Sequence, residues 1–276
     1  MIEGTDPEAI EQRLVLEAIH QRYGYDFRRY QPDSMRRRLQ ACLARSGLAH
    51  FGELQHRLLE SPEFFASLLD ALTVQVSEMF RDPAFYRVFR DRVVPLLRTY
   101  PEIRIWHAGC ASGEEPYTSA ILLAEEQLLD RAQIYATDVS ARAVERAREG
   151  VFPASQTELF SENYRLAGGQ RRFMDYCSAA YGKFTIGESL RQSVVFFQHD
   201  LVSDYALGEM QVVFCRNVLI CFANDVRARV LTMFGESLCR GGFLCLGANE
   251  SLPPAFAHEL AEFSASDRIF QKRAPA

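Results

Sequence analysis

A change in the sequence pattern near residue 100 is the strongest constraint on the fold. Up to about residue 98, apolar residues recur every three or four positions, which is typical of amphipathic helices. From Arg104 onward, short apolar runs alternate with helical patterns, in the order RIWHAGC, helix 115–130, QIYATDV, helix 140–149, QVVFCRN, a helix around 225–239 and GFLCLGA. Strands that alternate with helices form a mostly parallel sheet covered on both faces. We therefore expect an all-α N-terminal domain followed by a doubly wound α/β domain.

Prolines and glycines mark the expected ends of the early helices. Helices should begin near Pro32, Pro62 and Asp82, and helical patterns stop at Gly24 and Gly47. We expect three parts, which are a helical domain over 1–80, a connecting helix over 81–102 and a sheet domain over 103–276.

Two weaker strand signals complete the expected topology. Strand-like pieces lie on either side of Gly187 in KFTIGESLRQSVVFFQHDL, and they predict a small antiparallel β-subdomain around 170–195. The closing segment SDRIFQKR predicts a last edge strand.

The segment ASGEEP forms a turn of small residues between the first expected strand and its helix. Ligands of doubly wound sheets bind at the carboxyl ends of the strands, so this turn should lie near the ligand. A dinucleotide site would have the pattern G-x-G-x-x-G and offer the helix N-terminus to a pyrophosphate. Here Glu114 and Glu115 stand where the phosphate would lie. Their charges would repel phosphate and suit S-adenosylmethionine, which carries an ammonium and a sulfonium group and no phosphate.

Asp138 ends the second expected strand, where an acid can accept hydrogen bonds from both ribose hydroxyls. Each acid also has a purely structural explanation. Glu114 and Glu115 would stabilise the first turn of a helix by about 0.3–1 kcal/mol, and Asp138 would cap the next helix. The three acids together with the glycine turn favour a nucleoside ligand.

Composition narrows the class of protein. A net charge of −5 argues against general nucleic-acid binding. Seven cysteines without a C-x-x-C pair indicate reduced thiols and a cytoplasmic protein. No apolar stretch reaches the ~20 residues of a membrane helix, and the acidic start is unlike a signal peptide. His107 and Cys110 lack further ligands at metal spacing, so we expect no metal. A monomer is favoured, but the sequence leaves the oligomeric state open.

Four segments resemble the CheR-type chemotaxis receptor methyltransferases, which transfer a methyl group from S-adenosylmethionine to glutamate side chains of chemoreceptors. GCASGEEPYTSA is similar to the family's G-E-E-P-Y segment, and VVFCRNVLICF to its strand ending in C-R-N-V. TVQVSEMFRDPAFY resembles the entry to the catalytic domain, and GYDFRRYQPDSMRRRL resembles the N-terminal helical domain. The match runs from about residue 14 to 273. It implies a class I S-adenosylmethionine-dependent methyltransferase, with a Rossmann-like sheet, an all-α N-terminal domain and a small antiparallel β-subdomain.

The resemblance also implies a cofactor site. Arg81 is expected to pair with the cofactor carboxylate, Glu115 to hold its polar end and Asp138 to hold its ribose. The other expected cofactor contacts are Gln75, Ser77, Gly109, Asp200, Leu201, Asn217 and Val218. Of these, Asp200 and Leu201 correspond to positions beside the adenine.

Structural explanations compete with some of these roles. Arg81 beside Asp82 is also compatible with an ion pair at a helix start, worth at most ~1 kcal/mol. Asn217 is compatible with a cap at a strand end, and Arg216 with an ion pair inside the fold. For Arg81, Asp138 and Asn217 the functional explanation is favoured, because each lies in a family motif.

The implied reaction needs no general base, because a glutamate with a pKa of about 4.3 is ionised at neutral pH. Aligning the carboxylate, the methyl carbon and the sulfur can contribute on the order of 7–11 kcal/mol. The implied catalytic residues are Arg81, Asn217 and Cys221. The family commonly has an aromatic hydroxyl where Cys221 stands, and G-H-S-E where this chain has GANE at Gly247–Glu250. These departures leave open a different substrate or a regulatory, catalytically impaired protein that binds S-adenosylmethionine.

Residues 22–45 contain seven arginines and two aspartates, a net charge of +5 within an acidic protein. Arg36, Arg37 and Arg38 cannot all face the core of one helix. A solvated helix face is one explanation. The other is a docking surface for the cytoplasmic helical domain of a methyl-accepting chemoreceptor, whose glutamates would meet these arginines.

Overall fold

The structure is a computed structural model that describes residues 6–73 and 77–273. Its N-terminal part is helical and consists of α1 (Pro7–Tyr23), the 3₁₀ turn η1 (Phe27–Arg29), α2 (Pro32–Ser46), α3 (Phe51–Glu60) and α4 (Pro62–Leu72). The predicted boundaries are confirmed: α2 and α4 start at their prolines, and Gly24 and Gly47 end α1 and α2 in the left-handed conformation. The Ser61 hydroxyl accepts a hydrogen bond from Phe64 N and so caps α4.

The connecting helix is shorter than the predicted range of 81–102. It consists of α5 (Pro83–Val88), a π-helical segment η2 (Phe89–Val93) and α6 (Val94–Leu97). The helix stops before Pro101 because a proline disfavours helical backbone at the residue that precedes it, here Tyr100.

A seven-stranded sheet forms the second domain, with the order β6-β2-β1-β7-β8-β10-β9. Its strands are β1 (Ile103–Ala108), β2 (Ala132–Asp138), β6 (Val194–Gln198), β7 (Met210–Cys215), β8 (Leu238–Leu246), β9 (Leu260–Ser264) and β10 (Ile269–Lys272). The first five in sheet order are parallel, and β10 runs antiparallel to both β8 and β9. The strand predicted at the edge is therefore interior, and β9 is the edge instead.

Helices cover both faces of this sheet, as predicted. The helices of this domain are α7 (Glu114–Glu125), α8 (Ala141–Glu149), α9 (Thr157–Leu166), α10 (Glu188–Gln192) and α11 (Asn224–Ser237), with short turns η3 (Leu129–Arg131), η4 (Ala154–Gln156), η5 (Phe173–Tyr176), η6 (Leu219–Cys221) and η7 (Pro254–Phe256). Alternate residues of β1 face different cores: Ile103 and Ile105 pack with α7, whereas Trp106 and Ala108 face the core shared with α11 and the helical domain. Helix α7 ends earlier than the predicted residue 130.

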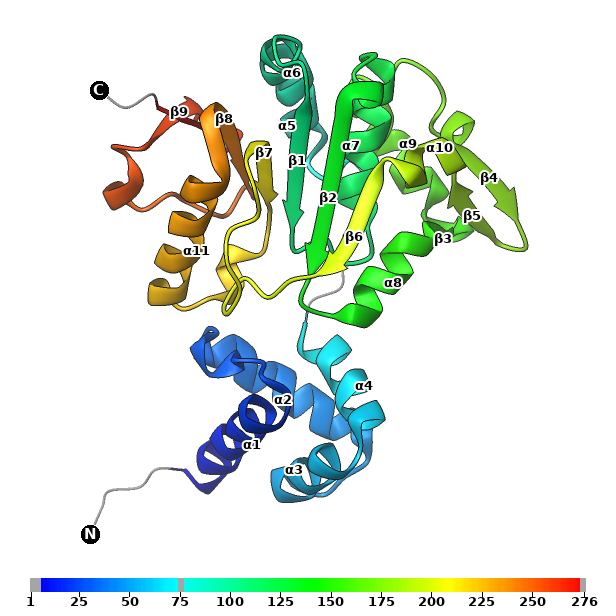
Figure 1. Cartoon of the computed structure of the whole chain (residues 1–276). Coiled ribbons are helices and arrows are strands. Elements are labelled where there is room, and N and C mark those ends of the chain that lie inside the picture. Colours follow the sequence, from blue (N-terminus) through cyan, green and yellow to red (C-terminus); the bar gives the residue numbers. More distant parts are fainter. Residues whose placement is uncertain (1–5, 74–76, 274–276) are drawn as a thin grey trace.

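A small three-stranded antiparallel sheet extends beyond α9, in the order β3-β5-β4 (Figure 1). Its strands are β3 (Val151–Pro153), β4 (Cys177–Ala180) and β5 (Lys183–Ile186). The β-subdomain is confirmed, but it begins earlier than the predicted range around 170–195. Val194, inside that range, already belongs to β6 of the main sheet.

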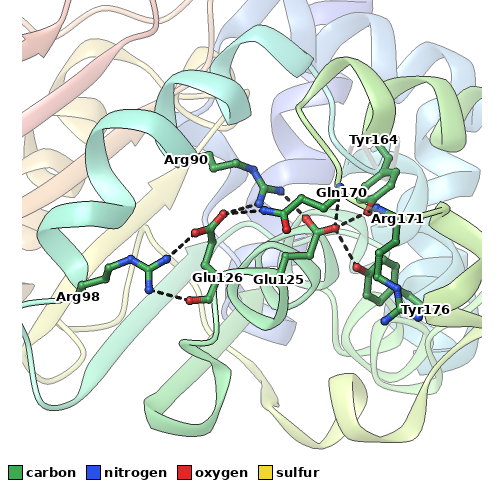
Figure 2. Close-up of polar contacts among 8 residues, drawn as sticks. All are labelled: Arg90, Arg98, Glu125, Glu126, Tyr164, Gln170, Arg171 and Tyr176. Atoms are coloured by element: carbon green, nitrogen blue, oxygen red, sulfur yellow. Dashed lines mark hydrogen bonds and ion pairs between the residues drawn. The ribbon is translucent and has the colours of Figure 1, made fainter.

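A buried polar cluster fixes the base of this subdomain (Figure 2). Arg90 of η2 forms ion pairs of 2.6 Å with Glu125 and with Glu126, at the end of α7. The Glu125 carboxylate also accepts hydrogen bonds from the hydroxyls of Tyr164 in α9 and Tyr176 in η5. Four segments that are distant in the sequence therefore meet at one carboxylate.

The helical domain lies across the carboxyl ends of the parallel strands (Figure 1). Tyr30 and Phe222 form an isolated antiparallel bridge, flanked by hydrogen bonds from Gln31 N to Cys221 O and from Ala223 N to Arg29 O. Elsewhere on the seam, which is the contact between the helical domain and the sheet domain, Asp70 of α4 accepts a hydrogen bond of 2.9 Å from Ser140 Oγ at the start of α8. The edge of the sheet where ligands bind in this fold is thus closed over by the first domain.

Candidate active site

The candidate site lies where the strand order reverses, since β1 has β2 on one side and β7 on the other. Two adjoining hollows occupy this place. The inner hollow is lined by residues of both domains, among them Tyr30, Arg38, Gly109, Asp138, Asp200, Leu201, Val218 and Cys221. The outer hollow holds about 1370 Å³ of space, part of it open solvent, and is lined by residues that include Arg37, Arg38, Ser77, Arg81, Glu115, Asn217 and Cys221. Most of the predicted site residues are therefore brought together.

The turn after β1 requires glycine at position 109. Gly109 has φ +85°, and a Cβ added there would lie 2.6 Å from Val218 Cγ2. The backbone of the β1 turn and the side chain after β7 therefore touch, which only glycine permits. This contact places Gly109 and Val218, two predicted cofactor contacts, side by side on the wall of both hollows.

The two glutamates that follow this turn have different environments. Glu115 faces the outer hollow, whereas Glu114 is buried and its carboxylate accepts hydrogen bonds from Ser112 Oγ. Burial raises the pKa of Glu114 above its usual value. The sequence-based expectation that both acids occupy the place of a phosphate is wrong for Glu114, because its side chain turns back onto the turn.

Glu115 belongs to a buried charge network. One carboxylate oxygen lies 3.0 Å from His107 Nδ1 and the other 3.2 Å from Arg216 Nη1. Burial acts to raise the pKa of Glu115, but the His107 hydrogen bond and the Arg216 charge outweigh it and lower the pKa. Glu115 is therefore a carboxylate at neutral pH, fixed at the floor of the hollow.

Asp82 forms its ion pair with Arg216 and not with the adjacent Arg81. The Arg216 guanidinium forms this ion pair at 2.7 Å and lies over the ring of Phe85, 4.2 Å from its centroid. The ion pair considered between Arg81 and Asp82 does not form. Arg81 lines the outer hollow and has no ion pair with any residue of 6–73 or 77–273.

The segment that carries Arg81 is held by two hydrogen bonds. Phe80 N donates to Thr118 Oγ1, and Asn163 Nδ2 donates to Met79 O. Phe80 and Asp82, on either side of Arg81, have left-handed backbone conformations. Ser77 lines the outer hollow nearby. Gln75, a predicted cofactor contact, lies outside the described residues.

Asp138 does not cap the helix that follows it. Its Oδ2 accepts a hydrogen bond from Ala111 N and its Oδ1 from Ser140 N, at 2.9 and 3.0 Å. The helix cap is Ser140, whose Oγ accepts from Ala143 N. The alternative role considered for Asp138, an N-cap, is therefore wrong. Asp138 also lines the inner hollow, together with Gly109 and Val139.

Asp200 and Leu201, which follow β6, line the inner hollow beside His199. Asp200 Oδ1 accepts a hydrogen bond from Val202 N, and burial raises the pKa of Asp200. Leu201 is buried and contributes an apolar wall. A planar ring with polar edges would suit such a pocket.

Asn217 sits in a tight turn that depends on a residue that we had not assigned from the sequence. Its φ is +63°, and Glu250 holds the turn by accepting hydrogen bonds from Asn217 N, Ile220 N and Gly247 N. A Cβ at Gly247 would lie 2.8 Å from Asn217 N. The GANE segment thus supports the turn that presents Asn217. No sequence signal marked Glu250 for this role, because it acts through backbone N–H groups.

The three arginines of α2 have three different roles in the structure. Arg36 is exposed and pairs with Asp33 at 3.0 Å, which is the solvated arrangement. Arg37 is exposed on the rim of the outer hollow and has no ion pair among the described residues. Arg38 turns inward, where its Nη1 donates to Leu72 O and its Nη2 lies 3.4 Å from Cys221 Sγ.

Two negative findings apply to residues 6–73 and 77–273. These residues contain no group of three or more His, Cys, Asp or Glu side chains arranged to hold a metal ion. Within the same ranges, no helix is both long and apolar enough to cross a membrane.

Comparisons with known proteins cover nearly the whole chain. The model of the CheR methyltransferase SAM-binding domain matches residues 75–268, and the model of the CheR all-alpha domain matches residues 10–73. Cher3 of Pseudomonas putida is 47% identical over 264 residues, which are 95% of this chain and 97% of that protein. The chemotaxis protein methyltransferase of Vibrio parahaemolyticus is 33% identical over 230 residues, which are 79% of this chain and 80% of that protein.

Proposed function

Because this chain belongs to the CheR methyltransferase family and its cofactor is S-adenosylmethionine, we propose that it methylates glutamate side chains of a methyl-accepting chemoreceptor in the cytoplasm. The products are glutamyl methyl esters and S-adenosylhomocysteine. Relatives named as chemotaxis protein methyltransferases support this choice of substrate. The reaction class is that of a protein-glutamate O-methyltransferase.

The distribution of charge at the site carries the proposal. The sheet domain contributes the acids Glu115 and Asp138 to the hollows, whereas helix α2 of the helical domain contributes Arg37 and Arg38. A cationic methyl donor suits the acids, and an anionic acceptor suits the arginines. A carboxylate that approaches the methyl group from the arginine side would meet complementary charge along its path.

The residues present fit the cofactor. Asp138, which lines the inner hollow, would accept hydrogen bonds from the ribose hydroxyls, and Glu115 would attract the ammonium group. Arg81, which has no ion pair with a described residue, would take the cofactor carboxylate, and Ser77 lines the same hollow. Asp200 and Leu201 would border the adenine, and Gly109, Asn217 and Val218 would border the methionine part.

When bound, S-adenosylmethionine supplies an electrophilic methyl group on a sulfonium sulfur. The protein orients the acceptor: Arg37 and Arg38 would guide its carboxylate, and the turn at Asn217 would fix the line of approach. The glutamate oxygen contributes the electron pair of the new C–O bond, and the sulfur keeps the pair of the broken bond. No proton is transferred, so the site needs no general base. Cys221 would border the reacting atoms as a small wall.

A second candidate function is favoured by the thiol at position 221. Cys221 lines both hollows. The family commonly has an aromatic residue with a hydroxyl at this position. A cysteine side chain is smaller and would leave more space for the acceptor. A different acceptor, or a regulatory role with impaired catalysis, would account for that difference.

Transfer of tritium from S-[methyl-³H]adenosylmethionine to purified receptor cytoplasmic fragments tests the proposal. We expect label that is released by base, as methyl esters are. Label on a small molecule, or on receptor in a base-stable form, would support a different acceptor. Binding of S-adenosylhomocysteine without any transfer would support the regulatory role.

A further inference from the structure

The inner hollow has a wall that the sequence analysis did not assign to the cofactor site. It is formed by the helical domain, which contributes Tyr30, Arg38 and Thr73 beside Asp138, Asp200 and Leu201 of the sheet domain. We propose that the Tyr30 hydroxyl binds the nucleoside part of S-adenosylmethionine, so that the helical domain is part of the cofactor site. This inference rests on the cofactor position proposed above and is independent of the acceptor.

The ring of Tyr30 is held rigidly on the seam between the domains. Its backbone forms the antiparallel bridge with Phe222. Its ring packs edge-on against Phe222 at 5.0 Å and against Phe27 at 4.9 Å between centroids. A side chain locked by two aromatic contacts loses little further rotational freedom when its hydroxyl binds a ligand.

The hydroxyl of this ring has no hydrogen-bond partner among residues 6–73 and 77–273, although the residue as a whole is largely buried, with 9% of its surface exposed. Because Tyr30 lines the inner hollow, a ligand bound there can supply the partner that the protein does not. Burial and the nearby carboxylates of Asp200 and Asp138 raise the pKa of Tyr30, so the hydroxyl remains protonated and can donate.

Its neighbours indicate a nucleoside rather than the acceptor. Tyr30 lines the inner hollow, at the ends of β2 and β6, and is absent from the lining of the arginine-rimmed outer hollow. The carboxylates of Asp138 and Asp200 near it would repel an acidic acceptor. A ribose hydroxyl or an adenine nitrogen is uncharged and can take a hydrogen bond from the phenol.

The substitution Tyr30→Phe tests this directly, because phenylalanine keeps both ring contacts and removes only the hydroxyl. We expect the Kd for S-adenosylhomocysteine, measured by titration calorimetry on the full chain, to rise about 3- to 10-fold. The Kd for 5′-methylthioadenosine, which lacks the amino acid part, should rise by the same factor.

Tyr23→Phe is the matched control. The Tyr23 hydroxyl lies in the same domain and donates to Leu58 O, away from both hollows. Its loss should lower the thermal midpoint and leave both Kd values unchanged. Equal Kd values for the wild type and Tyr30→Phe would refute the Tyr30 contact while leaving the cofactor site intact. A rise in the acceptor KM alone would assign Tyr30 to the acceptor instead. No binding by the wild type would overturn the cofactor site and this inference together.

Discussion

At the scale of single residues, Glu114 and Glu115 are a natural matched pair. They adjoin in the sequence, and both are in the first turn of α7, but only Glu115 lines a hollow and contacts His107 and Arg216. A shift of one position along α7 therefore determines that Glu115, and not Glu114, is placed to contact the cofactor.

We predict that Glu115→Gln weakens binding of S-adenosylhomocysteine by about tenfold or more. The substitution removes the negative charge proposed to face the ammonium group, and hydrogen bonds to charged groups are worth about 1.5–3 kcal/mol. Glu114→Gln, which keeps the fold of the turn, should change the Kd less than about twofold. Titration calorimetry on both variants measures the two Kd values. A similar loss of affinity in Glu114→Gln and Glu115→Gln would count against the assignment of Glu115.

The sequence allowed prediction of the residues that lie at strand ends and in motifs, such as Asp138 and Asn217. It could not have identified Tyr30 or Glu250 as part of the site. Tyr30 reaches the hollow only because its backbone pairs with Phe222, far away in the chain. Glu250 acts through three backbone N–H groups, and such contacts leave no pattern in one sequence.

At the scale of elements, helix α2 presents one exposed arginine to the site and another to solvent. Arg37 lines the outer hollow, whereas Arg36, one position earlier, pairs with Asp33 outside it. Arg38 also supports the seam through Leu72 O, so reversing its charge would disturb structure as well as docking.

We predict that Arg37→Glu raises the KM for an acidic receptor fragment several-fold and leaves the Kd for S-adenosylhomocysteine unchanged. A like charge on the rim would repel the acceptor's glutamates. Arg36→Glu is the control and should leave both constants near wild type. The effect of Arg37→Glu should also shrink at high salt. Parallel loss of cofactor affinity would remove Arg37 from the docking surface.

Helices with a strong apolar periodicity were predicted well. Strands that are defined by pairing with a distant strand were not. Helices α1, α2 and α4 have proline starts, and two of them have glycine ends. Strand β3 has three residues and exists because Val151–Pro153 pairs with β5. Strand β10 has the composition of an edge strand. It is interior because the chain forms β9 at the edge first and then places β10 between β9 and β8.

At the scale of the whole molecule, the cluster around Glu125 holds the subdomain to the core (Figure 2). The Glu125 side chain is 2% exposed and the Arg90 side chain 9%. Burial acts to raise the pKa of Glu125, but hydrogen bonds from Tyr164, Gln170 N, Arg90 and Tyr176 outweigh it and lower the pKa. The folded state therefore stabilises the ionised form.

We predict that Glu125→Gln lowers the free energy of unfolding by about 2–3 kcal/mol at pH 7, because Arg90 loses a buried partner. Since the folded-state pKa lies below the usual value of about 4.5, this contribution is complete above that pH. It is lost as the pH falls through the folded-state pKa, so the variant and the wild type should converge in acid. Denaturant unfolding between pH 7 and pH 3 measures this. Glu162→Gln, at an exposed ion pair with Arg165, should change stability little at any pH.

The central claim is that the acidic floor between β1, β2 and β7 holds S-adenosylmethionine beneath the helical domain. A crystal structure of the full chain with S-adenosylhomocysteine tests it most directly. We expect the ribose hydroxyls on Asp138, the amino acid end between Glu115 and Arg81, and the sulfur beside Asn217. A ligand bound elsewhere, or no ligand at a concentration that saturates a working methyltransferase, would contradict the account.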